Sequence, residues 1–357
     1  MAQTSSARSR KAAPKAKLRI FFATNRYYLS GLKFFGGQFN PEGVAALRFG
    51  WADFDLAKAA SPQNVYVYPD PKPKVPGGTV ANPGSKLFLD DLRVAMRDGC
   101  TDTIVFIHGF NVSFMDALKA GGALASEIAI GDKPINVVVF SWPSDGKAVP
   151  YMSYYSDRED ARTCGAAVAR TYLKLYDFMA ALDPKEYCDR KLHLIAHSMG
   201  NYVLRNGLQA LRVKDPTKIA RLFNEIVLAA PDEDDDAFET DDKLRLLPGL
   251  CRRITVYYNQ NDRALLISDK TKGNPDRLGS DGPRMLDLLP KKVFMVDCSR
   301  VAGEGDTMIQ HSYFITCPPV AADLKSTLTS LPPDAIGNRD EIRPERAYRI
   351  KPSHPPA

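Results

Sequence analysis

Ser198 stands in a short pattern that is typical of a serine nucleophile. An apolar run, 192–195, ends in Ala196-His197-Ser198-Met199-Gly200, and apolar residues at helical spacing follow at once. Small residues two places before and after the serine let a strand turn sharply into a helix, which lifts the hydroxyl clear of a sheet. Glycine is usual at the first of these places, and alanine leaves less room. The pattern predicts attack by Ser198 on an acyl group; the alternative is a structural serine in an ordinary buried turn.

A serine hydroxyl needs a base to take its proton and an acid to orient that base. The chain has only five histidines. We set four aside: His193 lies inside a predicted strand, His197 is expected to point away across the turn, His354 lies in a proline-rich tail and His108 belongs to another motif. His311 follows the strand-like run 292–298 and a polar loop, so it is the predicted base; the alternative is a water-exposed loop histidine.

The acid should come from a strand end between the serine and the histidine in chain order. The run 254–258 is followed by Asp262, which is the preferred acid, and the run 225–230 is followed by Asp232, which remains the alternative. Asp232 also opens the acidic run 232–236. Carboxylate oxygens suit a hard cation, but negative charge also suits a solvated helix start. We favour the helix start and predict neither a metal nor another cofactor.

Attack on an acyl carbon places negative charge on its oxygen, which backbone N–H groups must meet. One such group is predicted at Met199, directly after the nucleophile. The other is predicted at Phe110, because the β-branched run 103–107 ends in His108-Gly109, where the backbone is able to turn sharply. His108 is then expected to brace this loop at the edge of the pocket, with Asn111 beside it.

Strand-like and helix-like segments alternate along the chain, which predicts a mostly parallel sheet with helices on both faces. The eight predicted strands are 17–23, 64–68, 103–107, 135–141, 191–196, 225–230, 252–258 and 292–297. Helical spacing covers 114–128 and 161–182. Ser156 and Glu159 are expected to cap the start of the second helix, and Pro184 to end it.

This layout resembles the α/β-hydrolase superfamily. More narrowly, the chain is similar to a bacterial family of α/β hydrolases catalogued as a domain of unknown function. The narrower resemblance spans roughly residues 17–318 and rests on Ala23-Thr24-Asn25-Arg26, Phe106-Ile107-His108-Gly109-Phe110-Asn111, Phe140-Ser141-Trp142-Pro143-Ser144 with Asp157, the Ser198 motif, Ala230-Pro231-Asp232, Asn261-Asp262-Arg263-Ala264-Leu265 and His311-Ser312-Tyr313-Phe314. It implies the α/β-hydrolase fold and a serine-hydrolase site at Ser198, Asp262 and His311. It implies no particular substrate.

Aromatic residues near the predicted site are candidates for the pocket wall. Trp142 either lines the acyl pocket or covers the edge of the sheet, and Tyr151, Tyr154 and Tyr155 are expected at the mouth of the cleft. The stretch between the predicted strands 225–230 and 252–258 is short. We therefore expect no large lid and an open site for a small or flexible acyl substrate.

The charge and composition of the chain indicate its domain limits and argue against nucleic-acid binding. Its 357 residues carry a net charge of +6, and five of the cations lie within residues 1–17, which contain no acid, so the remainder of the chain is close to neutral. A nucleic-acid groove is therefore not expected. We predict a disordered basic tail over 1–16, one domain over 17–330, and a proline-rich tail over 331–357 without regular structure.

The sequence also bears on compartment and partners. It shows no secretory signal and no run long enough to span a membrane. The six cysteines are widely scattered, which favours free thiols in a reducing, cytoplasmic compartment. The expected partner is a small acyl substrate, and nothing in the sequence predicts an oligomeric state.

Three functions remain open from the sequence. The preferred one is hydrolysis of a carboxylic ester or thioester through an acyl-enzyme on Ser198. The second keeps the acyl-enzyme but passes the acyl group to an alcohol or amine. The third is a non-catalytic scaffold on a hydrolase fold whose tails bind partners.

Overall fold

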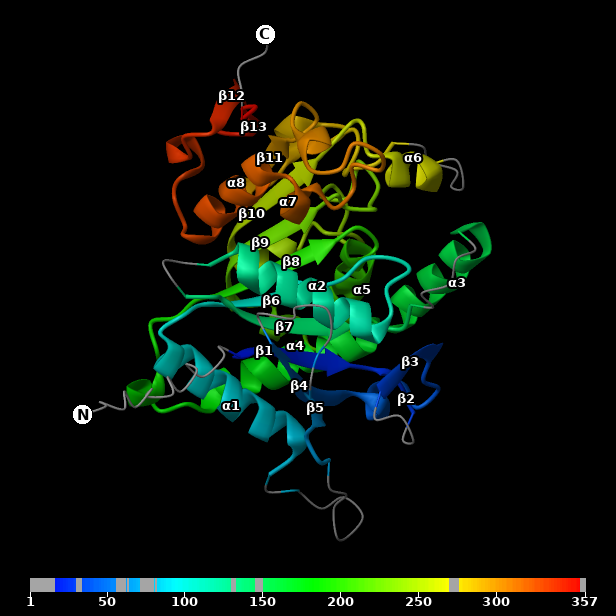
Figure 1. Cartoon of the computed structure of the whole chain (residues 1–357), viewed down its shortest axis with the longest axis vertical. Helices are drawn as coiled ribbons and strands as arrows, with labels where there is room; N and C mark the ends of the chain where they lie inside the picture. The colour runs from blue at the N-terminus through cyan, green and yellow to red at the C-terminus, as the bar shows by residue number, and fades with distance from the viewer. Residues whose placement is uncertain are drawn as a thin grey trace, which may run out of the picture.

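A large twisted sheet runs through the whole molecule (Figure 1). The computed structural model describes residues 17–29, 34–55, 62, 64–70, 80, 82–129, 133–144, 150–269 and 276–353. The predicted basic tail, 1–16, lies outside these residues. Within the described part, eleven strands form one sheet in the order β12-β13-β11-β10-β9-β8-β6-β7-β1-β4-β5, and β2 and β3 form a separate hairpin.

All eight predicted strands are present. They are β1 (Lys17–Thr24), β5 (Asn64–Val67), β6 (Thr103–Ile107), β7 (Asn136–Ser141), β8 (Leu192–His197), β9 (Phe223–Ala229), β10 (Cys251–Tyr258) and β11 (Val293–Asp297). Those not predicted are β2 (Arg26–Leu29), β3 (Phe34–Phe39), β4 (Arg48–Asp55), β12 (Arg339–Arg343) and β13 (Ala347–Ile350). The pairs β1–β4, β4–β5 and β12–β13 are antiparallel, and the other pairs in the large sheet are parallel. The prediction of eight strands was therefore too low.

Helices cover both faces of this sheet, as predicted. Alternate residues of a strand point to opposite faces, and in β7 Val137 and Val139 join one core while Val138 and Phe140 join the other. The core with Val138 includes α1 (Gly84–Gly99), α4 (Gly165–Ala181) and α5 (Gly200–Lys214). The core with Val137 includes α2 (Phe114–Glu127), α7 (Tyr313–Thr316) and α8 (Pro318–Leu328). Both faces are apolar because both are buried.

The segment predicted as one helix over 161–182 forms two. Helix α3 (Pro150–Thr163) precedes α4, and Cys164 separates them. Ser156 lies inside α3, so the predicted cap at this residue is wrong. Helix α4 ends at Ala181, and Pro184 opens a short 3-10 helix with Asp183 as its cap. Figure 1 shows α3 at the edge of the sheet to which the strand arrows point.

The remaining short elements lie in the connections. They are α6 (Arg263–Asp269) and the 3-10 helices η1 (Gly43–Ala46), η3 (Pro184–Glu186), η4 (Pro216–Lys218), η5 (Leu247–Leu250), η6 (Leu286–Leu288), η7 (Ala302–Glu304) and η8 (Pro333–Ala335). Between β9 and β10 the described chain forms turns, an isolated bridge from Asp234 to Arg277, and η5, which agrees with the expectation of no large lid. Among the described helices, none has the length and apolar character that a membrane crossing requires.

The C-terminal segment belongs to the sheet, so the prediction that 331–357 lacks regular structure is wrong. Strand β13 pairs with β11, and β12 pairs with β13. The buried Arg339 guanidinium donates at 2.7 Å to both oxygens of the buried Asp323 in α8, and Asp323 also accepts from the Tyr257 hydroxyl. Charge pairing therefore holds β12 against α8 and β10.

Candidate active site

The turn at Ser198 has the strained shape that its sequence predicts. Ser198 joins β8 to α5 with φ +53°, a left-handed conformation that non-glycine residues rarely adopt. Its N–H donates to the Ala229 carbonyl at 3.0 Å. A Cβ atom on Gly200 would lie 2.5 Å from the Ile107 carbonyl oxygen, so only glycine fits where α5 begins against β6. Neighbouring strands thus fix the position of the serine.

His311 is paired with Asp262, the preferred acid. Nδ1 of His311 lies 2.7 Å from Oδ2 of Asp262, whose side chain is fully buried. Oδ1 of Asp262 accepts from the N–H groups of Ala264 and Leu265 at 3.1 Å each. These are the unpaired amides at the start of α6, which favour a carboxylate. The carboxylate is therefore held in place independently of the histidine.

The loop before His311 is held by its own hydrogen bonds. The Asp306 carboxylate accepts from the N–H groups of Met308, Ile309 and Gln310 at 2.9–3.0 Å. The Gln310 carbonyl in turn accepts from the Asn259 side chain, which follows β10. The imidazole thus reaches Asp262 on an ordered loop.

Burial alone lowers the pKa of His311, but the adjacent Asp262 carboxylate outweighs burial, with smaller contributions from Asp232 and Asp306. The pKa of His311 is therefore raised above its ordinary value. This environment stabilises a protonated imidazole, which is what a base needs once it has taken a proton.

Asp232, the alternative acid, has other partners. It accepts from the Tyr154 hydroxyl at 2.7 Å, and its backbone N–H donates to the Ser198 carbonyl at 3.2 Å. Its Oδ1 lies 3.9 Å from Nε of the buried Arg277. The structure therefore joins His311 to Asp262, while Asp232 lines the cavity into which Ser198 and His311 open.

The acidic run 232–236 is not the solvated helix start that we expected. It forms turns, and Asp232, Glu233 and Asp235 are buried. Cations from distant segments neutralise the run. The ion pairs join Glu233 to Arg205, Asp234 to Arg277 and Lys243, and Asp236 to Lys243. The sequence next to the acidic run does not predict these ion pairs, because folding brings the cations close to it.

The loop after β6 runs directly against the serine. A Cβ atom on Gly109 would lie 2.9 Å from Cβ of Ser198, so glycine allows the close approach. Phe110 follows and lines the cavity with Ser198 and His311. Among the described residues, the N–H groups of Phe110 and Met199 have no acceptor. The two predicted oxyanion donors are therefore free for a substrate oxygen.

Arg26 holds this loop in place, a role that the sequence reasoning missed. Its fully buried guanidinium donates to the Val112 carbonyl at 2.7 Å, the Ser144 carbonyl at 3.0 Å and the Ser141 hydroxyl at 2.9 Å. It also lies 3.3 Å from Nε2 of His108. Because a guanidinium has only donors, Nε2 of His108 accepts, and its Nδ1–H donates to the Gly109 carbonyl at 2.8 Å.

His108 braces the loop, as predicted, and Trp142 lies behind it. The two rings stack at 5.2 Å with an interplanar angle of 11°, and the indole N–H donates to the His108 carbonyl. Burial, with a smaller contribution from Arg26, lowers the pKa of His108 to about 3, so this ring is neutral. Trp142 is fully buried and does not line the cavity within the described residues, so of the two positions left open for it the pocket wall is the wrong one.

Two further expectations about the pocket need correction. Asn111 is exposed and does not contribute to the described cavity wall, whereas Tyr154 does. His197 does not point away: its ring lies 4.7 Å from that of His311 and 4.9 Å from that of Phe314. Its Nε2 is 3.2 Å from the His311 carbonyl oxygen, and burial lowers the pKa of His197 well below its ordinary value. A neutral His197 therefore donates to the backbone of His311.

Ser198 and His311 open into one cavity of about 350 Å³. Its wall is mainly apolar and includes Phe106, Phe110, Val112, Leu265, Phe314 and Ile315. Polar side chains in the lining include Ser198, His311, Asp232 and Tyr154. Such a cavity accommodates an apolar group attached to a polar reacting centre.

The fold and this arrangement define an α/β hydrolase. A family described as "Alpha/beta hydrolase of unknown function (DUF900)" matches residues 90–328. The chain belongs to this family.

Similarity to individual proteins is more distant. An uncharacterized protein of Nostoc sp., alr1448, is 26% identical over 234 residues, which cover 59% of this chain and 57% of that protein's length. A cell surface hydrolase of Lactobacillus plantarum WCFS1 aligns with a TM-score of 0.36 at 12% identity, over 66% of this chain and 95% of that one. Phospholipase PlaB of Legionella pneumophila aligns at 0.23 and 13% identity, over 55% and 39%.

Proposed function

We propose that this protein is a serine hydrolase that cleaves a carboxylic ester or thioester through an acyl-enzyme on Ser198. The observation that carries the proposal is the 2.7 Å contact between His311 and the buried Asp262, in a cavity that also contains the Ser198 turn. A serine, a histidine and a carboxylate in this order form a proton relay on many folds.

The reaction has two steps. In the first, Nε2 of His311 takes the Ser198 hydroxyl proton while the serine oxygen bonds to the acyl carbon, and the histidine returns the proton to the departing alcohol or thiol. In the second, His311 takes a proton from water while the water oxygen bonds to the acyl carbon. The bond from the acyl carbon to the Ser198 oxygen then breaks, His311 returns the proton to that oxygen, and the acyl group leaves as a carboxylic acid. Asp262 stabilises the imidazolium in both steps. The N–H groups of Met199 and Phe110 donate to the oxyanion.

The apolar wall favours an acyl group with little polarity. Phe110, Leu265 and Phe314 come from three different loops or helices and leave about 350 Å³ between them. Burial of each methylene contributes about 0.8 kcal/mol, so we expect KM for 4-nitrophenyl esters to fall from acetate to hexanoate.

Labelling by a fluorophosphonate tests the nucleophile. We expect labelling of the folded protein at Ser198, complete loss in Ser198→Ala, and retention in Ser312→Ala, whose serine lines the same cavity without a proposed catalytic role. Unlabelled but folded wild-type protein, or equal loss in both variants, would contradict the proposal. Products formed with and without added alcohol then show whether water or an alcohol accepts the acyl group.

A further inference from the structure

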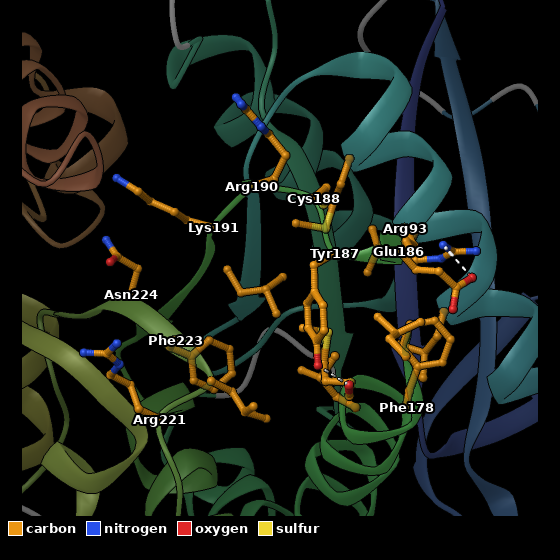
Figure 2. Close-up of a pocket in the computed structure, with 18 residues that line it drawn as sticks. Arg93, Phe178, Glu186, Tyr187, Cys188, Arg190, Lys191, Arg221, Phe223 and Asn224 are labelled. Atoms are coloured by element: carbon orange, nitrogen blue, oxygen red, sulfur yellow. Dashed lines mark hydrogen bonds and ion pairs between the residues drawn. The ribbon is translucent and has the colours of Figure 1, made fainter. Parts of the chain in front are cut away.

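A second cavity lies at the opposite edge of the sheet from Ser198. It measures about 270 Å³ and opens where β8 and β9 begin, at Leu192 and Phe223 (Figure 2). Ser198 follows the last residue of β8. Since a strand rises by about 3.3 Å per residue, the length of β8 separates the two cavities by about 20 Å. None of the proposed catalytic residues lines this second cavity.

The floor of this cavity is apolar. It lies between the ends of α1 and α4, which contribute Leu89, Leu92, Met96, Leu175, Phe178 and Met179. Leu89, Leu92 and Met96 recur at helical spacing on the buried face of α1. Tyr187 and Cys188 stand over this floor in Figure 2. An aliphatic chain in this space would be removed from water.

The mouth of the cavity is cationic. Among the described residues, the lining includes four basic side chains and one acidic side chain, which are Arg93, Arg190, Lys191, Arg221 and Glu186. Glu186 already contacts Arg93 at 3.2 Å and accepts from the Asp183 N–H. Arg190 donates to the Cys100 carbonyl and Lys191 to the Ser330 hydroxyl. Both acceptors are uncharged, so neither contact is an ion pair, although the Asp102 carboxylate accepts from the Lys191 backbone N–H at 2.8 Å.

Lys191 and Arg221 extend on the same side of the cavity, with Asn224 between them (Figure 2). Within the described part of the chain, neither cation has a carboxylate oxygen at 4.0 Å or less. Arg93 adds a further unused donor, because its buried Nε has no hydrogen-bond acceptor. Cations that lack a side-chain carboxylate contact and lie beside an apolar floor are suited to an anionic head group.

We propose that this cavity binds an amphipathic anion, an aliphatic carboxylate of medium chain length. The carboxylate lies between Lys191 and Arg221, and the chain lies on the floor formed by α1 and α4. The cavity volume of about 270 Å³ is modest, which limits an aliphatic chain to medium length. This matches a chain such as that of decanoate.

The rate of chemical modification of Cys188 measures ligand binding at this cavity and does not depend on catalysis. It is half-buried in the cavity wall, whereas Cys164, Cys251, Cys298 and Cys317 are buried and Cys100 is exposed. In a Cys100→Ser background, the rate of N-ethylmaleimide modification at Cys188 is followed by mass spectrometry against decanoate concentration. The same titration in a Ser198→Ala background separates this site from the proposed active site.

We expect decanoate to slow the modification of Cys188 saturably, and decanol at equal concentration to protect much less. Lys191→Gln with Arg221→Gln should weaken protection by roughly fivefold or more, because each exposed ion pair contributes about a factor of two to five. The matched control, Arg162→Gln with Arg245→Gln, removes two exposed cations elsewhere and should leave protection unchanged. Absence of protection, equal protection by decanol, or unchanged protection in the Lys191 and Arg221 variant would overturn the proposal.

Discussion

Replacing Asp262 with asparagine alters one atom of the group that orients the proposed base. The asparagine oxygen keeps the two bonds from Ala264 and Leu265, so α6 should still begin in the same place. Its NH₂ group then faces Nδ1 of His311, where the carboxylate oxygen lies at 2.7 Å in the wild type. A donor at that position favours the tautomer with its proton on Nε2. That imidazole has no lone pair for the Ser198 proton.

The expected loss in kcat follows from this change of tautomer. The equivalent substitution in serine proteases lowers kcat by roughly 10⁴, and each tenfold loss corresponds to about 1.4 kcal/mol of barrier. We therefore expect Asp262→Asn to lose roughly 10³–10⁴ in kcat, or about 4–5.5 kcal/mol, with a small change in KM.

Asp232→Asn is the matched control for this prediction. Asp232 is buried at the wall of the same cavity, but it contacts Tyr154 rather than His311. We expect it to lose less than about tenfold in kcat, because its contribution at His311 is electrostatic only. Both variants are assayed with 4-nitrophenyl butyrate, and thermal unfolding confirms that they fold. The reasoning is refuted if folded Asp262→Asn keeps more than a tenth of wild-type kcat, or if Asp232→Asn loses as much.

Three other predictions follow from single contacts. His311 must be neutral to act as a base, and its pKa is raised, so kcat/KM should fall as pH drops through a value above the ordinary histidine pKa of about 6.5. Asp232→Asn should move this fall in kcat/KM to lower pH. The raised pKa of His311 also stabilises the folded protein at pH values below the histidine pKa of the unfolded chain, and this stabilisation is lost as pH rises through the pKa of the folded protein. Gly109→Ala should lower kcat/KM by roughly 10² because its Cβ atom would press on Ser198, whereas Gly122→Ala, whose Cβ atom meets Phe54 at 3.8 Å, should have little effect; equal activities would contradict this. Arg339→Ala should cost about 3–5 kcal/mol of unfolding free energy in urea, because it leaves Asp323 buried without its cation, while Arg343→Ala at an exposed pair should cost less than about 1 kcal/mol.

The sequence predicted the parallel strands in the middle of the sheet and the edge strand β5, and it missed β4, β12 and β13, which lie at or next to the two edges. Parallel strands such as β7 read as continuous apolar runs, which are easily recognised. Strand β4 carries Arg48, Asp53 and Asp55 among its apolar residues, and Asp53 pairs with Arg19 across the strand pair. Strands β12 and β13 escaped prediction because prolines surround them. Pro344 lies in the turn between the two strands and interrupts neither.

In the candidate site, the order of residues along the chain predicted which side chains follow the strand ends. The contact between Asp262 and His311 is as expected. Contacts that depend on side-chain direction could not be predicted. His197 precedes Ser198, and we expected its ring to point away across the turn. The ring instead packs against His311. Trp142 follows a strand next to the site, but stacking on His108 places it beneath the loop rather than in the cavity.

The buried guanidinium of Arg26 connects several short motifs that are far apart in the chain to the loop beside Ser198. Its contacts join the end of β1 to the segment after β7 and to the loop after β6. A lysine has a single nitrogen and cannot reach three acceptors in fixed directions. Because Arg26 also donates to Nε2 of His108, it fixes the His108 tautomer whose Nδ1–H binds the Gly109 carbonyl. The direction of the next peptide, which carries the Phe110 N–H, therefore depends on a cation that itself does not line the cavity.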